Sequence, residues 1–248
     1  MMIGIRSWQQ QVPLPQMYSG NNSWSIPLQP ELSNEPISTR NNFYRGAIAL
    51  AINGVPVFNA LNNRGEDAYL AGELDQWGGH CGRADDYHYH IIPEHLSSTD
   101  QILPIAFALD GFAIYGNKEP DGAAVFALDS CNGHFDAAHI YHYHATHHYP
   151  YSVGAFRGKV QIDPKTSAPE NQIIPQAFAR PVRPPGKPLR GAFISKFETT
   201  GPTEFTVTYQ LNNQATTIRY YWNSQSVIFI NQNQHGILDS ISYPIRKF

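Results

Sequence analysis

The chain of 248 residues has little lysine, two cysteines and no long apolar run. No segment approaches the roughly 20 apolar residues of a membrane-spanning helix, so we expect no membrane span. The 17 basic and 20 acidic residues are scattered, and no basic face for nucleic acid is predicted. The sequence also lacks a P-loop, a dinucleotide fingerprint, a nucleophile elbow and an HExxH motif, so none of those chemistries is favoured.

The two cysteines, Cys81 and Cys131, leave three roles open: one disulfide, two free thiols or metal ligands. A bridge requires that their turns meet, with Cα atoms about 4.4–6.8 Å apart. No signal peptide is visible in residues 1–15, because an apolar core of the necessary length is missing. The low lysine content and the many Asn and Gln residues favour a periplasmic or extracellular location, and the cytoplasm stays open.

Two apolar hairpins form the first part of an internal repeat. Residues 48–58 read IALAINGVPVF and residues 105–115 read IAFALDGFAIY, at an offset of 57. The Asn-Gly and Asp-Gly dipeptides predict tight type I′ turns, because such turns need positive φ angles. Both hairpins are nearly continuously apolar, so we expect both to be buried.

A second match follows each hairpin. Residues 74–90 and 128–144 both fit Leu-Asp-x3-Gly-His-x6-Tyr-His-Tyr-His, at an offset of 54. We therefore predict a mainly β, internally duplicated core with a pseudo-twofold axis, since matched apolar hairpins bury best against each other. Its two copies are residues 46–95 and 103–148.

The predicted domain organisation places this core at residues 46–162. Residues 1–45 are expected to form an N-terminal arm with strands, and residues 163–189, with seven prolines, a semi-rigid linker. Residues 190–248 are predicted to form a small antiparallel β meander, in which EFTVTYQL alternates polar and apolar residues.

Three histidines in each copy predict a metal site. Side chains alternate along a strand, so the two histidines of each YHYH segment point to one face, and the Gly-His turn brings a third. Three imidazoles suit zinc or copper and disfavour Ca²⁺ and Mg²⁺. The predicted ligands, expected to face a common region, are His80, His88, His90, His134, His142 and His144.

Other residues near these histidines have open roles. Asp75 and Asp129 either cap their turns or accept the second ring N–H of a ligand histidine. Asp85, Asp86 and His139 are candidates for a general base beside a metal-bound water. The four YHYH tyrosines are expected to pack. The alternative to metal binding is that the duplication copied a structural hydrogen-bond network.

The paired segments GGHCGRADDYHYH and CNGHFDAAHIYHYHATHHYPY, with their hairpins, resemble the YHYH protein family. The resemblance covers roughly residues 36–160. It supports the repeat and its boundaries and adds to the argument for export. It implies no particular reaction.

Three function classes stay open on the sequence. The first is a His-rich metalloprotein that holds copper or zinc, with metal-dependent catalysis by Lewis-acid or redox chemistry as its extension. The second is a non-catalytic metal-handling protein. The third is a binding or adhesion module with structural histidines. A metal ion is the one expected partner; no protein or small-molecule partner is identified.

Overall fold

The computed structural model describes residues 1–15, 18–19, 24–44, 46–82, 87–98, 102–160, 162, 178–179, 182–184 and 186–245. These residues are mainly β, as predicted, with one short 3-10 helix at Glu94–Leu96. In this part of the chain, no helical segment has the length and apolar character needed to cross a membrane. The contacts divide the chain into a first unit (Met1–Ser19, Leu70–Tyr87, Phe178–Phe248) and a second unit (Gly20–Tyr69, His88–Ala177).

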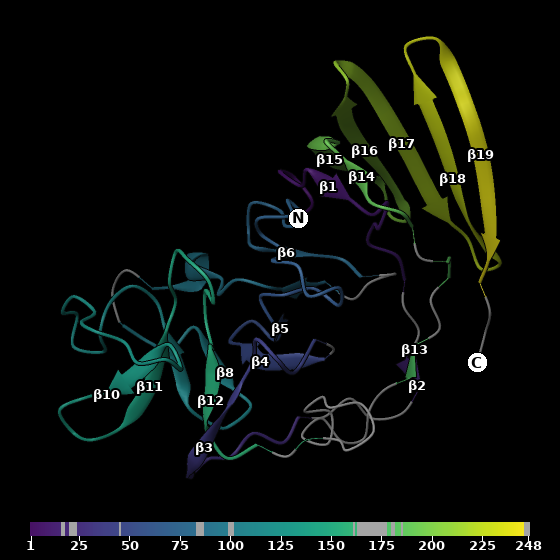
Figure 1. Ribbon diagram of the computed structural model, residues 1–248. Helices are drawn as coiled ribbons and strands as arrows, with labels where there is room; N and C mark the ends of the chain where they lie inside the picture. The colour runs from purple at the N-terminus through teal and green to yellow at the C-terminus, as the bar shows by residue number, and fades with distance from the viewer. Residues whose placement is uncertain are drawn as a thin grey trace. The chain divides into compact units, whose positions relative to one another are not determined.

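The second unit contains a sheet built from the predicted hairpins and YHYH segments (Figure 1). Its strands lie in the order β10 (Gly133–Phe135), β11 (Tyr141–His144), β9 (Ala113–Tyr115), β8 (Ala106–Ala108), β4 (Ala47–Ala51), β5 (Pro56–Phe58) and β7 (His88–Tyr89). Two of the pairs are parallel, β11 with β9 and β7 with β5, and the other pairs among these strands are antiparallel.

The register of this sheet gives matched residues of the sequence repeat equivalent positions, while the duplication itself stays a prediction. At its centre β4 pairs with β8, and Leu50 lies opposite Phe107, its own match in the repeat. Outward from this pair, β5 and β7 follow on one side, and their matches β9 and β11 follow on the other. Val57 lies opposite Tyr89, and the matched Ile114 lies opposite Tyr143. This order has the twofold character that two packed copies would produce.

The two hairpin turns are alike, but they are not the predicted type I′ turns. The N–H of Gly54 donates to the Ala51 carbonyl, and the N–H of Gly111 donates to that of Ala108. Each glycine has a positive φ, +81° and +94°, whereas the residue before it does not. A type I′ turn would need positive φ at both positions; here glycine alone takes the left-handed conformation, as in a three-residue hairpin loop with a bulge.

The segment predicted as an N-terminal arm supplies strands to both units. In the second unit β3 (Leu32–Ser38) pairs with β12 (Ala155–Gly158). In the first unit β1 (Ser7–Trp8) pairs with β14 (Leu189–Arg190), and β2 (Tyr18–Ser19) pairs with β13 (Phe178–Ala179). The predicted linker at 163–189 lies largely outside the described residues.

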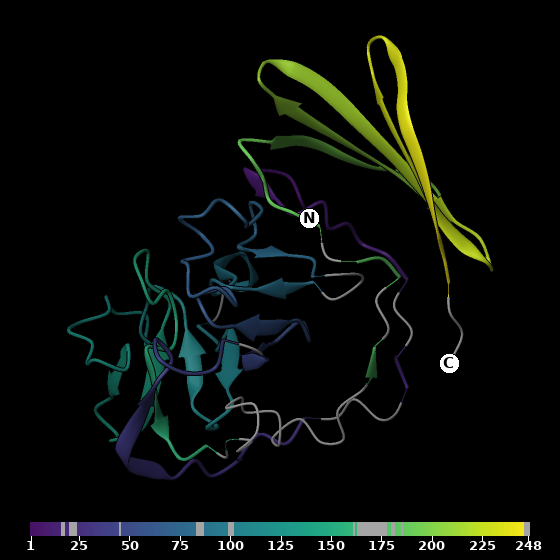
Figure 2. The same ribbon diagram turned by 45° about the vertical axis from the view of Figure 1, so that its right-hand side comes forward.

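The C-terminal meander is a five-stranded antiparallel sheet in the first unit (Figures 1 and 2). One face carries Ile194, Val207, Tyr220 and Phe229, which pack with N-terminal residues such as Trp8 into a buried core. The strands are β15 (Phe193–Gly201), β16 (Glu204–Leu211), β17 (Gln214–Trp222), β18 (Ser226–Asn233) and β19 (Gly236–Pro244).

Candidate metal centre

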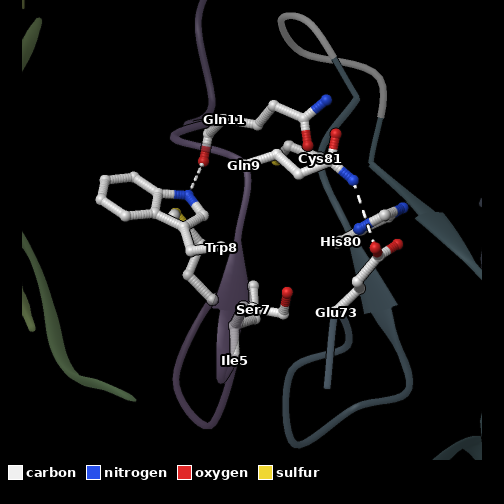
Figure 3. A pocket seen from close by; sticks show the side chains of 9 residues that line it. Ile5, Ser7, Trp8, Gln9, Gln11, Glu73, His80 and Cys81 are labelled. Atoms are coloured by element: carbon white, nitrogen blue, oxygen red, sulfur yellow. Dashed lines mark hydrogen bonds between the residues drawn. The ribbon is translucent and has the colours of Figure 1, made fainter. Parts of the chain in front are cut away.

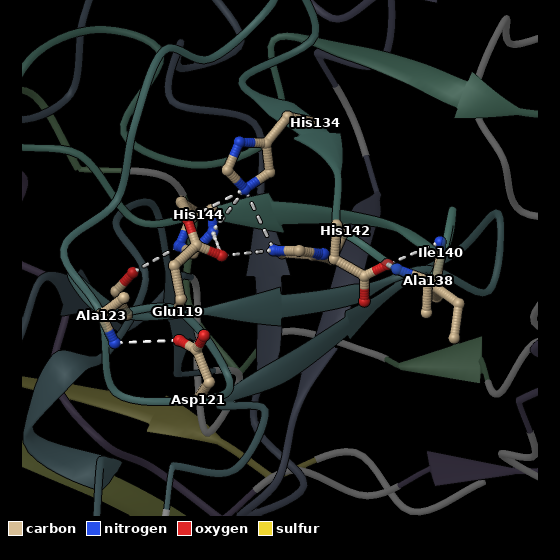
Figure 4. Close-up of polar contacts among 10 residues, drawn as sticks. Glu119, Asp121, Ala123, His134, Ala138, Ile140, His142 and His144 are labelled. Carbon is tan, nitrogen blue, oxygen red and sulfur yellow. Dashed lines mark hydrogen bonds and ion pairs between the residues drawn. The ribbon is translucent and has the colours of Figure 1, made fainter.

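Three of the predicted histidines meet a glutamate in the second unit (Figure 4). One donor atom from each of Glu119, His134, His142 and His144 lies within 4.8 Å of every other. All four side chains are buried, and His144 is fully covered, at 0% exposure.

Strand pairing places the three imidazoles. In the antiparallel pair of β10 and β11, His134 lies directly opposite His142. His144 follows two residues later on β11, so its side chain projects from the same face. Tyr141 and Tyr143 project from the other face and are fully buried, as the predicted packing role requires.

Glu119 reaches the histidines from the loop that follows β9. A tight turn holds it: the N–H of Glu119 donates to the Ala123 carbonyl, and the N–H of Gly122 donates to the Glu119 carbonyl. Glu119 Oε1 lies 3.1 Å from His134 Nε2, and Oε2 lies 3.1 Å from His142 Nε2 and 3.5 Å from His144 Nε2. Oε1 has no hydrogen bond among the described residues, although it is buried.

The spacing of these donors fits a tetrahedral metal shell. His134 Nε2 lies 3.1 Å from His142 Nε2 and 3.2 Å from His144 Nε2. With metal–ligand bonds of about 2.0–2.2 Å, neighbouring donors of a tetrahedral shell lie about 3.3–3.6 Å apart. Three imidazoles and one carboxylate at this spacing could hold zinc or another transition metal.

A backbone carbonyl orients His144. Its Nδ1 lies 2.8 Å from the Gly116 carbonyl oxygen. We assign the ring proton to Nδ1, because a carbonyl can only accept, and Nε2 then presents its lone pair to the cluster. Burial disfavours the imidazolium and lowers the pKa of His144, which keeps the ring in the neutral form that binds metals.

Sequence reasoning missed Glu119. The signal for it lies in the repeat, since the hairpin offset of 57 continues into the next turn and matches Glu119 with Asn62. The matched turns have the same hydrogen bonds. The N–H of Asn62 donates to the Glu66 carbonyl, and the N–H of Gly65 donates to the Asn62 carbonyl. Asn62 uses its side-chain oxygen to cap its own turn, accepting from the N–H groups of Arg64 and Glu66.

The predicted ligands of the first copy are divided between the two units. His88 and His90 belong to the second unit, where their ring centres lie 5.0 Å apart. His90 Nδ1 lies 2.5 Å from the Asn59 carbonyl oxygen, a contact that matches His144 with Gly116. Burial, together with the charge of His88, lowers the pKa of His90 to about 3.

His80 lies in the first unit, on β6 (Gly79–His80). It lines a pocket there together with Trp8, Gln9 and Glu73 (Figure 3). The amide of Gln9 donates to Glu73 Oε1 across 3.3 Å, and the Trp8 indole N–H donates to the Gln11 carbonyl.

Within the second unit, the histidines of the two YHYH segments do not face one common region, contrary to the expectation. Within the second unit, β7 with His88 and β11 with His142 and His144 are separated by four other strands. At about 4.8 Å between strands, these two segments lie roughly 24 Å apart. A single site formed by both YHYH strands is therefore excluded.

Asp75 and Asp129 cap their turns rather than orient a histidine. Asp129 Oδ1 accepts from the N–H groups of Cys131 and Gly133 and from the Tyr141 hydroxyl. Asp75 Oδ1 accepts from the matched Trp77, Gly79 and Tyr87. Capping explains why Asp recurs at this point of the repeat.

The remaining candidates lie outside the cluster. His139 is exposed and does not belong to the four-residue group. The neighbouring His147 and His148, for which no role was predicted above, are exposed as well. Asp85 and Asp86 lie outside the described residues. Cys81 and Cys131 are both buried, and neither takes part in a disulfide among the described residues.

One known protein family matches part of this chain. The model of a family described as YHYH protein matches residues 23–125. The resemblance to the YHYH protein family is thereby confirmed over these residues. The match includes both hairpins and the first YHYH segment, and it ends before β10 and β11. No curated protein and no solved structure matches the chain.

Proposed function

We propose that this chain binds a transition metal through Glu119, His134, His142 and His144. The observation that carries the proposal is the set of donor separations of 3.1–3.5 Å among four buried side chains. Without a cation, the cluster leaves Glu119 Oε1 and His134 Nδ1 buried with no hydrogen bond among the described residues. Such groups are costly, and coordination of Oε1 would offset part of that cost.

Zinc is the first candidate and copper the second. Zinc accepts a tetrahedral shell of nitrogen and oxygen donors, whereas Cu²⁺ prefers square-planar or tetragonal geometry. Calcium and magnesium are disfavoured, because both require oxygen ligands.

Four protein donors favour a metal-holding role over catalysis. A catalytic zinc keeps one position for water or substrate, while a structural zinc has four protein ligands. An enzyme would require Glu119 to leave the metal. The adhesion alternative with structural histidines predicts no bound metal at all. Metal binding by His80, His88 and His90 stays a prediction from the sequence repeat, as does export from the cytoplasm.

Elemental analysis of the protein, produced without a histidine tag, tests the proposal. We expect the double variant His142→Ala, His144→Ala to lose one equivalent of metal per chain relative to the wild type. The matched control is His147→Gln with His148→Gln, which removes two exposed histidines from the same region and should keep the wild-type metal content. Wild-type protein that stays metal-free after incubation with zinc and copper would refute the proposal.

A further inference from the structure

His134 differs from His144 in how its imidazole ring is held. The Nδ1 atom of His134 is buried and has no hydrogen bond among the described residues, whereas Nδ1 of His144 lies 2.8 Å from the Gly116 carbonyl oxygen. Metal-binding histidines usually donate this second ring N–H to a carbonyl or a carboxylate, which fixes the orientation of the ring. The imidazole of His134 therefore needs another contact to hold its orientation.

The ring of Phe126 provides such a contact. Its centre lies 4.0 Å from the centre of the His134 imidazole, and the two ring planes are inclined by 33°, so one face of the imidazole lies against the phenyl ring. The rings of His142 and His144 meet the same imidazole at 74° and 90°, with centres 4.8 Å and 5.1 Å away. The imidazole of His134 is thus enclosed between Phe126 and the other two histidines.

Phe126 lies mostly in water, although it touches a buried histidine. Its side chain is 59% exposed. Replacement of such a surface residue usually changes the free energy of unfolding little. A change in metal binding on its replacement would therefore report on the contact with His134.

One loop brings both Glu119 and Phe126 to the histidines. The Glu119 carboxylate contacts all three imidazoles from the beginning of the loop (Figure 4). An antiparallel bridge between Lys118 and Ala124 closes the turn that follows, and Phe126 comes two residues after this bridge. The stacking contact therefore also holds the segment that carries the glutamate.

The first copy uses the matched aromatic residue differently. Its bridge between Leu61 and Asp67 matches the bridge of the second copy at the hairpin offset of 57, and the same offset matches Phe126 with Tyr69. The ring of Tyr69 lies 5.7 Å from that of Tyr151. The position is aromatic in both copies, but in the second copy its ring lies on a proposed metal ligand.

We propose that Phe126 is a positioning residue of the metal centre, which orients His134 and favours its metal-bound form. This inference rests on the proposed function. Zinc with three neutral imidazoles and one carboxylate has a net positive charge, part of which is carried by the imidazoles. The face of a phenyl ring attracts a cationic group within about 6 Å of its centre. Because the metal-free imidazole is neutral, this attraction stabilises the metal-bound state more than the metal-free state.

The zinc affinity of the full chain, measured by competition with a chelator, tests the proposal. We expect the dissociation constant to rise about threefold or more in Phe126→Leu, because leucine fills space but has no aromatic face. Phe126→Trp should bind zinc at least as tightly as the wild type, since tryptophan attracts cations best. Phe107→Leu on β8 is the matched control, because it removes another exposed phenylalanine of the same unit, and it should leave the constant unchanged.

Thermal unfolding of the metal-free proteins separates positioning from folding, and Phe126→Leu should unfold close to the wild type. Wild-type affinity in Phe126→Leu, or equal weakening in the leucine and tryptophan variants, would overturn the role of Phe126 and leave the metal centre standing. A loss of metal-free stability as large as the loss of zinc affinity would overturn it too, because the ring would then act on folding. A wild type that binds no zinc would instead contradict the metal centre itself.

Discussion

Glu119 is the residue that distinguishes a metal centre from a cluster of histidines. Between residues 117 and 130, all of which the structure describes, it is the one buried side chain. Its exposure is 7%, and its carboxylate faces three imidazoles. A surface loop that buries a single acid supplies the fourth donor of the proposed shell.

Replacing Glu119 by Gln should weaken metal binding at least tenfold, or about 1.4 kcal/mol. The amide is neutral and a poorer zinc ligand, but three imidazoles remain, so binding is reduced rather than abolished. The dissociation constant is measured by competition with a chelator. Asp121→Asn is the matched control, because it removes one exposed negative charge from the same loop. If both variants lost the same metal affinity, Glu119 would act only through its negative charge near the site and not as a ligand.

Asp110 is a second buried acid, and its effect depends on pH. Its Oδ2 accepts from the Tyr143 hydroxyl and the Gly158 N–H. Burial nevertheless raises the pKa of Asp110 to about 6. The folded state therefore binds a proton between about pH 4 and 6 that the unfolded state does not, so protonation of Asp110 favours folding as the pH falls.

We predict that Asp110→Asn destabilises the protein more at pH 4.5 than at pH 7, by about 2 kcal/mol. The asparagine cannot take up the proton, so the variant lacks the gain that the wild type makes on acidification. Urea unfolding of both proteins at both pH values measures this. Every other ionisable group is present in both proteins and cancels in the comparison. A difference that does not vary with pH would contradict the raised pKa.

At the scale of elements, the close pairing of β10 and β11 holds the histidines together. The backbone at Gly133 has no room for a side chain. A Cβ there would overlap the His142 carbonyl oxygen and would lie 2.6 Å from the Tyr141 hydroxyl oxygen. Glycine is therefore needed at position 133 because the backbones of β10 and β11 approach each other too closely there for a side chain.

Gly133→Ala should destabilise the chain by about 1–3 kcal/mol and lower its metal content, because β10 must move away from β11 and carry His134 with it. Thermal unfolding and elemental analysis measure the two effects. Gly122→Ala is the control: it has a positive φ of +86° and nothing within 4 Å of the added Cβ. If both variants lose the same stability and keep their metal, the steric argument fails.

The sequence predicted the elements where the pattern is local. The hairpins follow from apolar runs around Asn53-Gly54 and Asp110-Gly111, and alternation predicted that His142 and His144 share a face. Glu119 escaped prediction because its burial depends on a loop folding back over β11. The type I′ turns were wrong because one glycine suffices for the loop that forms.

For the whole molecule, the sheet order decides how many sites the repeat can form. A single site shared by the two YHYH segments would require that their strands meet at the pseudo-twofold axis. The structure instead places β4 and β8 at the centre and the YHYH strands outside them. Hairpins with continuous apolar runs occupy the centre of the sheet, because exposing their side chains to water would cost the most free energy. The two copies also differ in a possible metal ligand, because the first has Asn62 at the position where the second has Glu119.

The most direct test of the metal centre is a crystal of zinc-incubated protein, measured on both sides of the zinc absorption edge. The account predicts an anomalous peak about 2.0–2.2 Å from the Nε2 atoms of His134, His142 and His144 and from one oxygen of Glu119. Ordered side chains at this cluster with no anomalous peak between them would contradict it, and the histidines would then be structural.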